Sequence, residues 1–201
     1  MLTLAIQSGG DSSRMGQDKA LMPFLGEPLI KRVVNRLDRL SDDILVTTNH
    51  PQDYLFLDLR LIPDLEQGRG ALGGLYTALS ASEYPLVAVV ACDMPFASLQ
   101  LFEFLRDILL SDDLDAAVPS THKGIEPLHA VYRRETCLPM VKASLAAGDW
   151  KLISWFERGN IRVLTQEEVS PFDPHGLVFW NLNSPREFNL AQKKAREIPD
   201  A

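Results

Sequence analysis

The sequence predicts a doubly wound α/β fold, a three-layer sandwich on a mostly parallel sheet with an antiparallel edge. Strand-like and helix-like patterns alternate along the chain, as parallel sheets require. The run 85–92 is almost wholly apolar, as expected for a central parallel strand that helices cover on both faces. Polar residues follow four expected strands, and ligands of such sheets bind beyond the carboxyl ends of the strands. The fold class therefore also indicates where a site would lie.

The first half of the chain supplies most of the regular elements. Residues 2–6 form a short apolar run that predicts a buried first strand. Pro23 and Pro28 bracket a turn at Gly26, and apolar residues then recur over 29–40 with the helical period of about 3.6 residues. Further strands are expected at 44–48, 59–62 and 85–92, and helices at 68–80 and from Ser98 to Leu110.

The second half is less regular but continues the alternation. Strands are expected at 116–119 and 161–164, and 128–132 is expected to form an antiparallel strand at the sheet edge. Helices are expected at 135–147, which Gly148 stops, and at 150–158, which Gly159 stops. Residues 178–183 read as a last extended segment, and Ser184-Pro185 as the cap and start of a terminal helix to about Arg196. We expect one domain over 1–201.

Composition excludes several classes of protein. A net charge of −7 and a pI near 5.1 argue against broad electrostatic binding of nucleic acid. No run approaches the ~18 apolar residues that span a membrane, and 2–6 is too short for the apolar region of a signal peptide. Cys92 and Cys137 lack metal-type spacing and are expected to be reduced thiols. We therefore expect a soluble, cytoplasmic protein with no membrane or nucleic-acid partner.

The segment from Ser8 to Lys19 carries the strongest chemical signal in the chain. Gly9 and Gly10 come directly after the first strand, and Arg14 and Lys19 follow within twelve residues. Glycines let the backbone approach a ligand closely, successive backbone N–H groups form a concavity for anions, and an arginine fork suits phosphate oxygens. This pattern predicts a triphosphate site at the carboxyl end of the first strand. An ordinary loop with surface charges is the alternative.

Other polar residues are candidates because they too follow expected strands. Asp93 follows the most apolar strand, where Mg²⁺ would compensate a desolvated carboxylate; capping of the next helix is the alternative. Asp64 and Asn49 could contact a base or ribose, or serve as turn formers. Asn181 and Asn183 alternate on one face of their segment, which indicates a polar substrate, while capping of the last helix competes for Asn183. A lone histidine such as His129 is more often structural than catalytic.

Several motifs occur in the order of one known family. They are Gln7-Ser8-Gly9-Gly10, Arg14-Met15-Gly16 with Lys19, Gly70-Ala71-Leu72-Gly73-Gly74, Cys92-Asp93-Met94-Pro95, and Asn181-Leu182-Asn183-Ser184-Pro185. Through them the chain resembles the molybdenum cofactor guanylyltransferases, the molybdopterin-guanine dinucleotide biosynthesis protein A family of the nucleotidyltransferase superfamily. Gln7 and Ser8 replace the family's Leu-Ala, and Ala71 replaces a Pro. The resemblance implies a Rossmann-like, nucleotide-diphospho-sugar-transferase-like fold.

The resemblance also implies the reaction: transfer of GMP from GTP to molybdenum-molybdopterin, with pyrophosphate released. The nucleotide contacts it implies are Gln7, Ser8, Gly9, Gly10, Lys19, Asn49, Asp64 and Asp93. Asp93 would also hold Mg²⁺, Arg14 and Lys19 would neutralise phosphate charge, and Asn181 and Asn183 would lie on the acceptor side. Molybdoenzyme apoproteins or their chaperones are candidate partners.

Two alternatives remain at this point. The first is a related enzyme, either a cytidylyltransferase for the same cofactor or another nucleotidyltransferase that acts on a small phosphate. The second is a nucleotide-binding regulator without turnover, for which the Gln7-Ser8 departure is the only support. A dinucleotide-binding dehydrogenase is disfavoured, because the loop lacks the close G-x-G-x-x-G spacing and Asn49 stands where an acidic residue is expected.

Overall fold

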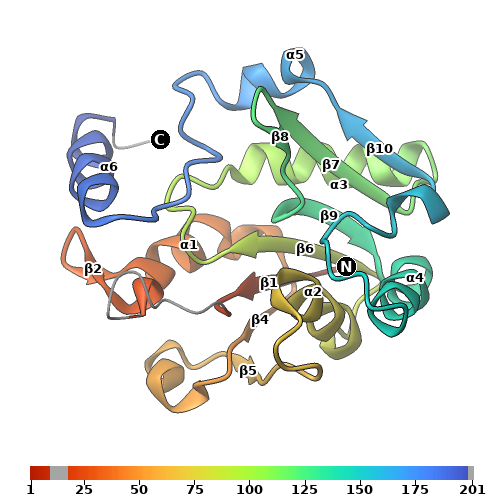
Figure 1. The fold of residues 1–201 in the computed structure, drawn as a ribbon. Helices are drawn as coiled ribbons and strands as arrows, with labels where there is room; N and C mark the ends of the chain where they lie inside the picture. The colour runs from red at the N-terminus through yellow and green to blue at the C-terminus, as the bar shows by residue number, and fades with distance from the viewer. Residues whose placement is uncertain (10–17, 199–201) are drawn as a thin grey trace.

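The computed structural model describes residues 1–9 and 18–198, and an eight-stranded mixed sheet runs through its centre (Figure 1). Seven strands form one hydrogen-bonded path, and short β8 (Gly124–Ile125) pairs only with β7. In order across the sheet, the seven are β10 (Ile161–Leu164), β7 (Ala116–Thr121), β9 (His129–Arg133), β6 (Leu86–Ala91), β1 (Leu2–Gln7), β4 (Asp43–Thr47) and β5 (Arg60–Ile62). The expectation of a mostly parallel sheet is confirmed.

The antiparallel part of the sheet lies to one side of β6. β9 is antiparallel to both β6 and β7, as expected for 128–132, but the expected position at the edge is wrong because β9 lies between two strands. Short β8, at the end of β7, is antiparallel as well. The direction of β9 follows from the short connection before it. Only a few residues separate β7 from β9, and a tight reversal returns the chain antiparallel beside the strand it has left. β9 is not an edge strand because it fills the position between β7 and β6 and pairs with both.

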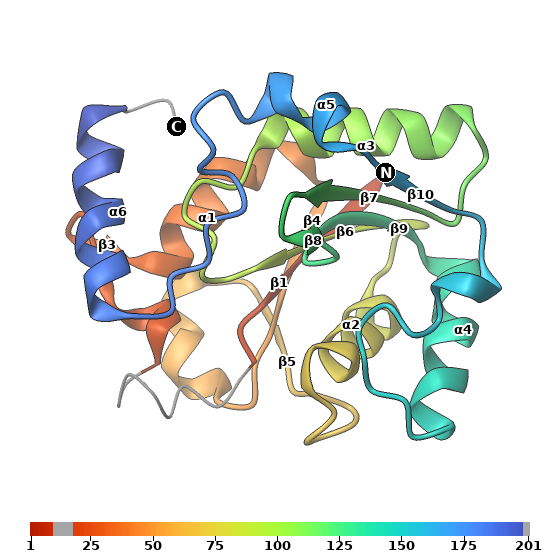
Figure 2. The same ribbon diagram turned by 45° about the horizontal axis from the view of Figure 1, so that its top comes forward.

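Helices cover both faces of the sheet, which completes the three layers. The long helices are α1 (Leu29–Leu37), α2 (Gly70–Ala81), α3 (Leu99–Ser111), α4 (Arg134–Ala146) and α6 (Pro185–Glu197), and α5 (Gln166–Val169) is a single turn. Figure 2 shows α3 above the sheet and α2 and α4 below it. None of the helices in the described ranges combines the length and apolar character that a membrane crossing needs.

The alternation of side chains along β6 explains why both faces need covering. Ala88 and Val90 pack into the cluster that contains α1 and α3, whereas Val87 and Val89 pack into the cluster that contains α2 and α4. All six residues of β6 are buried. A strand that is buried on both faces is expected to be continuously apolar, which is what the sequence shows.

A third apolar cluster attaches the C-terminal helix beside the main sheet. Phe188 of α6 lies edge-on to Phe24, with ring centroids 5.6 Å apart, and Leu182 is fully buried in the same cluster. Phe24 belongs to a two-stranded hairpin, β2 (Pro23–Phe24) and β3 (Glu27–Pro28), whose turn has Gly26 at a φ of 95°. The predicted turn is therefore confirmed, and this packing brings the start of α6 to the carboxyl edge of the sheet.

Two local predictions are wrong. Residues 150–158 form turns and the 3₁₀ helix η5 (Phe156–Arg158) rather than an α-helix. Trp155 is fully buried while Ile153 is 41% exposed, so the segment has no continuous apolar stripe. Residues 178–183 are not one extended segment, because 178–179 lie in a turn and only 180–183 continue without regular structure; the Leu182 N–H there donates to the Asp93 carbonyl at 3.1 Å.

Candidate active site

The carboxyl ends of β1, β4, β5 and β6 meet at one edge of the sheet. In the parallel registers Gln7 lies level with both Thr47 of β4 and Ala91 of β6, and Thr47 lies level with Ile62 of β5. The chain therefore leaves all four strands at the same height. The candidate residues that follow these strands are therefore brought together at this carboxyl edge of the sheet, which we call the rim, as the topology of parallel sheets requires.

Lys19 connects three distant parts of the chain at this rim. It begins the 3₁₀ helix η2 (Lys19–Leu21), and its Nζ donates to Asn183 Oδ1 at 2.8 Å and lies 3.9 Å from Asp93 Oδ2. The side chains of Lys19 and Asp93 are only 20% and 18% exposed. Lys19, predicted for phosphate chemistry, thus lies within contact distance of both Asp93, predicted for the metal, and Asn183, predicted for the acceptor.

Asp93 is held as a poorly solvated carboxylate in the turn after β6. Burial raises the pKa of Asp93 above its ordinary 3.8, and Glu187 adds to the rise, while the Lys19 ammonium acts in the opposite direction. The alternative of helix capping is excluded, because the N-cap of α3 is Ser98, whose hydroxyl accepts the Leu101 N–H at 3.2 Å. The Asp93 side chain is therefore not used as a helix cap, and a cation in addition to Lys19 would stabilise its charge.

Asn49 and Asp64 form a reciprocal pair across the ends of β4 and β5. Asn49 Nδ2 donates to Asp64 Oδ2 at 2.9 Å, and the Asp64 N–H donates to Asn49 Oδ1 at 3.2 Å. Asp64 Oδ1 is buried and has no partner among the described residues. Gly9 lies against the same carboxylate, since a Cβ built there would be 3.6 Å from Asp64 Oδ2. The pair therefore lies beside Gly9 and has one acceptor oxygen without a partner among the described residues.

Gln7 and Ser8, where the sequence departs from its family, are both largely buried. The Gln7 amide packs against α2: a Cβ built on Gly74 would lie 2.7 Å from Gln7 Oε1. Gln7 Nε2 is a buried donor that no described residue accepts. The Ser8 hydroxyl forms a 2.5 Å hydrogen bond with the Tyr54 hydroxyl, so it is engaged within the protein. The Gln7 side chain has an uncommitted donor at the rim, whereas Ser8 is structural in its contacts.

Asn183 and Asn181, just before α6, make different contacts: Asn183 uses its side chain and Asn181 its backbone carbonyl. The N-cap of α6 is Ser184, whose hydroxyl accepts the Glu187 N–H at 3.2 Å, so capping by Asn183 is excluded. Asn183 instead accepts from Lys19 and donates through Nδ2 to the Asn181 carbonyl at 3.4 Å. Asn183 therefore belongs to the rim cluster directly, and Asn181 joins it through its backbone.

Comparison with known proteins assigns the chain to a family. The family model for the MobA-like NTP transferase domain matches residues 4–162. The chain belongs to this family. It is 32% identical to a probable molybdenum cofactor guanylyltransferase of Pelotomaculum thermopropionicum, over 96% of this chain and 93% of that protein. It is 30% identical to the molybdenum cofactor guanylyltransferase of Desulfosudis oleivorans, over 95% and 94%.

The same family is represented among solved structures. The molybdopterin-guanine dinucleotide biosynthesis protein A of Archaeoglobus fulgidus superposes with a TM-score of 0.83 at 25% identity, over 97% of this chain and 99% of that one. The resemblance inferred from the motifs and the nucleotide-diphospho-sugar-transferase-like fold are therefore confirmed. Gly10 and Arg14, two residues of the predicted MobA-like phosphate loop, lie outside the described residues.

Three residues of this MobA-like site were not expected from the sequence. Tyr54, in the 3₁₀ helix η4 (Pro51–Leu57), contacts Ser8 and Asp18, and no spacing signal marks it. Asp18 caps η2 by accepting the Ala20 N–H at 3.0 Å. Glu187 holds Asn183 in place by accepting its N–H at 2.8 Å. Only Glu187 had a readable signal, because Ser184-x-x-Glu187 is a capping-box pattern.

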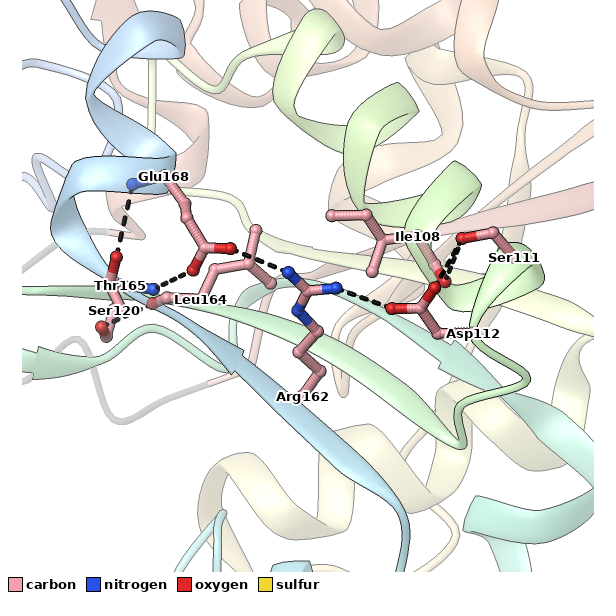
Figure 3. A network of polar contacts seen from close by, with 8 residues as sticks. All are labelled: Ile108, Ser111, Asp112, Ser120, Arg162, Leu164, Thr165 and Glu168. Atoms are coloured by element: carbon pink, nitrogen blue, oxygen red, sulfur yellow. Dashed lines mark hydrogen bonds and ion pairs between the residues drawn. The ribbon is translucent and has the colours of Figure 1, made fainter.

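A separate cavity of about 400 Å³ lies beside Trp180, which immediately precedes Asn181 in the chain. Its walls come from the end of β7 and the β8 turn, from Glu126 and from the segment that ends at Trp180. The polar network in Figure 3 supports one wall: the Ser120 hydroxyl donates to the Leu164 carbonyl at 2.6 Å, and Arg162 bridges Asp112 and Glu168 at 2.6 and 2.8 Å. These contacts join β10 to β7, to the end of α3 and to α5.

Proposed function

We propose that this chain transfers GMP from GTP to the terminal phosphate of molybdenum-bound molybdopterin and releases pyrophosphate. The observation that carries the proposal is the convergence of Lys19, Asp93 and Asn183 from three separate parts of the fold. The full-length similarity to proteins named molybdenum cofactor guanylyltransferase supports the choice of nucleotide and acceptor. We propose the cytoplasm as its location, since both cysteines of the chain are free.

The proposed reaction needs charge stabilisation more than proton transfer. An oxygen of the acceptor phosphate attacks the α-phosphorus of GTP in line, and the bond from that phosphorus to the oxygen bridging to the β-phosphate breaks. The acceptor phosphate is ionised at neutral pH, so a strong general base is unnecessary. Positioning and neutralisation of phosphate charge then supply most of the catalysis. Lys19 is placed for this role, because its ammonium is anchored by Asn183 and lies beside Asp93.

The residues at the rim fit a magnesium ion. Mg²⁺ prefers one or two carboxylates together with phosphate oxygens and water, and Asp93 offers a carboxylate whose burial already calls for a compensating cation. We therefore assign Asp93 as the residue that would hold Mg²⁺. When bound, the ion would neutralise charge on the triphosphate.

The remaining rim residues divide between the two substrates. On the nucleotide side we place Gln7, Ser8, Gly9, Gly10, Asn49 and Asp64, with Arg14 joining Lys19 at the phosphates. Asp64 Oδ1 and Gln7 Nε2 have no partner among the described residues, and they are an acceptor and a donor that a guanine base or ribose could satisfy. On the acceptor side we place Asn181 and Asn183, with the cavity beside Trp180 as the space for the larger part of the acceptor.

A nucleotide screen followed by a turnover assay tests the proposal. We expect GTP with Mg²⁺ to raise the melting temperature of the chain more than ATP, CTP or UTP does. We then expect pyrophosphate release only when GTP and molybdenum-molybdopterin are both present. Asp93→Asn serves as the control that removes the carboxylate and keeps the side-chain shape. Preferential stabilisation by CTP would favour the cytidylyltransferase alternative, and GTP binding without pyrophosphate release would favour a non-catalytic regulator.

A further inference from the structure

The hydroxyl of Tyr54 joins two residues that are far apart in the sequence. Its ring is fully buried, and its oxygen lies 2.5 Å from Ser8 Oγ and 2.5 Å from Asp18 Oδ2. A phenol has one proton and a carboxylate can only accept, so Tyr54 donates a hydrogen bond to Asp18 and accepts one from the Ser8 hydroxyl. Burial also raises the pKa of Tyr54, which keeps the donor protonated at any working pH.

The two partners flank the segment predicted to bind the phosphates. Ser8 directly follows β1, and its backbone is already held because its N–H donates to the Thr47 carbonyl at 2.9 Å. Asp18 directly precedes η2 and caps it through its other oxygen, which accepts the Ala20 N–H at 3.0 Å. Ala20 of η2 is buried in the core cluster that also holds β1, and the bond between Tyr54 and Asp18 adds a polar link that fixes the start of η2, where Lys19 stands.

The position of η2 in turn sets the position of the Lys19 ammonium. Lys19 is the first residue of η2, and its long side chain reaches Asn183 and Asp93 from there. A lysine on a flexible stem contributes to charge stabilisation only when its backbone is held at the right distance. Without the Tyr54 bond, Asp18 still caps η2 by accepting the Ala20 N–H, but among the described residues it loses its side-chain link to Ser8 through the Tyr54 hydroxyl.

We propose that Tyr54 is a positioning residue for the nucleotide site. Its hydroxyl holds Asp18, and Asp18 in turn sets the position of the Lys19 backbone from which the ammonium reaches Asp93. This inference rests on the proposed binding of GTP. Tyr54 touches neither reacting atom nor substrate in this role, and it acts through Asp18 and Lys19.

The test compares Tyr54→Phe with the wild-type chain by calorimetric titration with GTP and Mg²⁺. The variant keeps the buried ring and loses only the hydroxyl, and we expect the affinity for GTP to fall about tenfold, the effect of one hydrogen bond to a charged group. We expect no further loss when Tyr54→Phe is added to Lys19→Ala, because both changes remove the same contribution. Asp18→Ala removes the acceptor of the Tyr54 bond together with the cap of η2, and it is expected to lose at least as much affinity as Tyr54→Phe.

A matched control separates positioning from general stability. Tyr132 is also fully buried, and its hydroxyl donates to the Pro127 carbonyl at 2.6 Å; we expect Tyr132→Phe to leave the affinity for GTP unchanged. Equal GTP affinity of wild type and Tyr54→Phe would overturn this inference and leave the proposed function intact. The same holds if the loss caused by Tyr54→Phe adds in full to the loss caused by Lys19→Ala in the double variant. A wild-type chain that binds no GTP would instead overturn the proposed function, and this inference with it.

Discussion

We expect acid to destabilise the fold through His129 more than through an ordinary exposed histidine. His129 is fully buried at the start of β9 and stacks on Phe102 with ring centroids 4.0 Å apart. Its Nε2 accepts the Ser98 N–H at 3.1 Å, so the ring proton is assigned to Nδ1. Burial lowers the pKa of His129 to about 3, because a charged ring would be poorly solvated there.

The sign and size of the effect follow from linkage. Between pH 6.5 and about 3 the unfolded chain binds a proton at this histidine and the folded chain does not, so the free energy of unfolding falls as the pH falls. At pH 5 the unfolded pKa lies about 1.5 pH units above the solution pH, and at about 1.36 kcal/mol per unit the loss is about 2 kcal/mol. The result is the same for any folded pKa well below 5. For a chain of this size, that loss corresponds to roughly 4–8 °C in melting temperature.

The assay is urea unfolding at pH 7.5 and pH 5.0, for the wild type and for His129→Gln. Glutamine keeps an oxygen that can accept the Ser98 N–H but does not titrate. Other titrating groups are common to both proteins, so we expect the wild type to lose about 2 kcal/mol more than the variant over this range. An equal loss in the two proteins would show that His129 does not stay neutral in the folded state.

Three further predictions concern the rim. Lys19→Ala should lower kcat/KM about 5- to 150-fold, the effect of about 1–3 kcal/mol, and unchanged kinetics would remove Lys19 from the reaction. Asp93→Asn should abolish pyrophosphate release and yet raise the melting temperature without nucleotide, since it removes a carboxylate whose pKa burial raises; a lowered melting temperature would contradict this. Gly74→Ala should raise the KM for GTP, because its Cβ would lie 2.7 Å from Gln7 Oε1; steady-state kinetics with an unchanged KM would show that the Gln7 amide does not contact the base.

The sequence was sufficient for the fold class wherever an element is defined by local pattern. The apolar run that became β6, the helical period that became α1 and the Ser98 cap of α3 all appear where they were expected. Each depends on residues close in the sequence, through side-chain burial, helical period or a capping hydroxyl. The motifs placed the chain in its family for the same reason, because they are short and read without any tertiary contact.

Prediction failed where the conformation of a segment depends on contacts with residues that are distant in the sequence. Residues 178–183 begin with an apolar run and end with Asn181 and Asn183 on alternate positions, but Leu182 bonds to the turn after β6, and no local pattern reports that partner. The position of β9 between β6 and β7 likewise depends on which strand edge is free when the chain returns. Tyr54 gave no signal at all, since its importance lies in two hydrogen bonds to residues that are 46 and 36 positions away.

The amino-acid sequence by itself predicted a parallel sheet with polar residues after the carboxyl ends of its strands. It also predicted that Lys19 belongs to that edge of the sheet. Only the tertiary structure decided which of those residues meet. Lys19 contacts Asn183, 164 positions away, and lies 3.9 Å from Asp93, because α6 packs on the β2–β3 hairpin and brings its N-terminus to the rim. Such contacts depend on how apolar side chains from distant parts of the chain pack together, and no local sequence pattern specifies that packing.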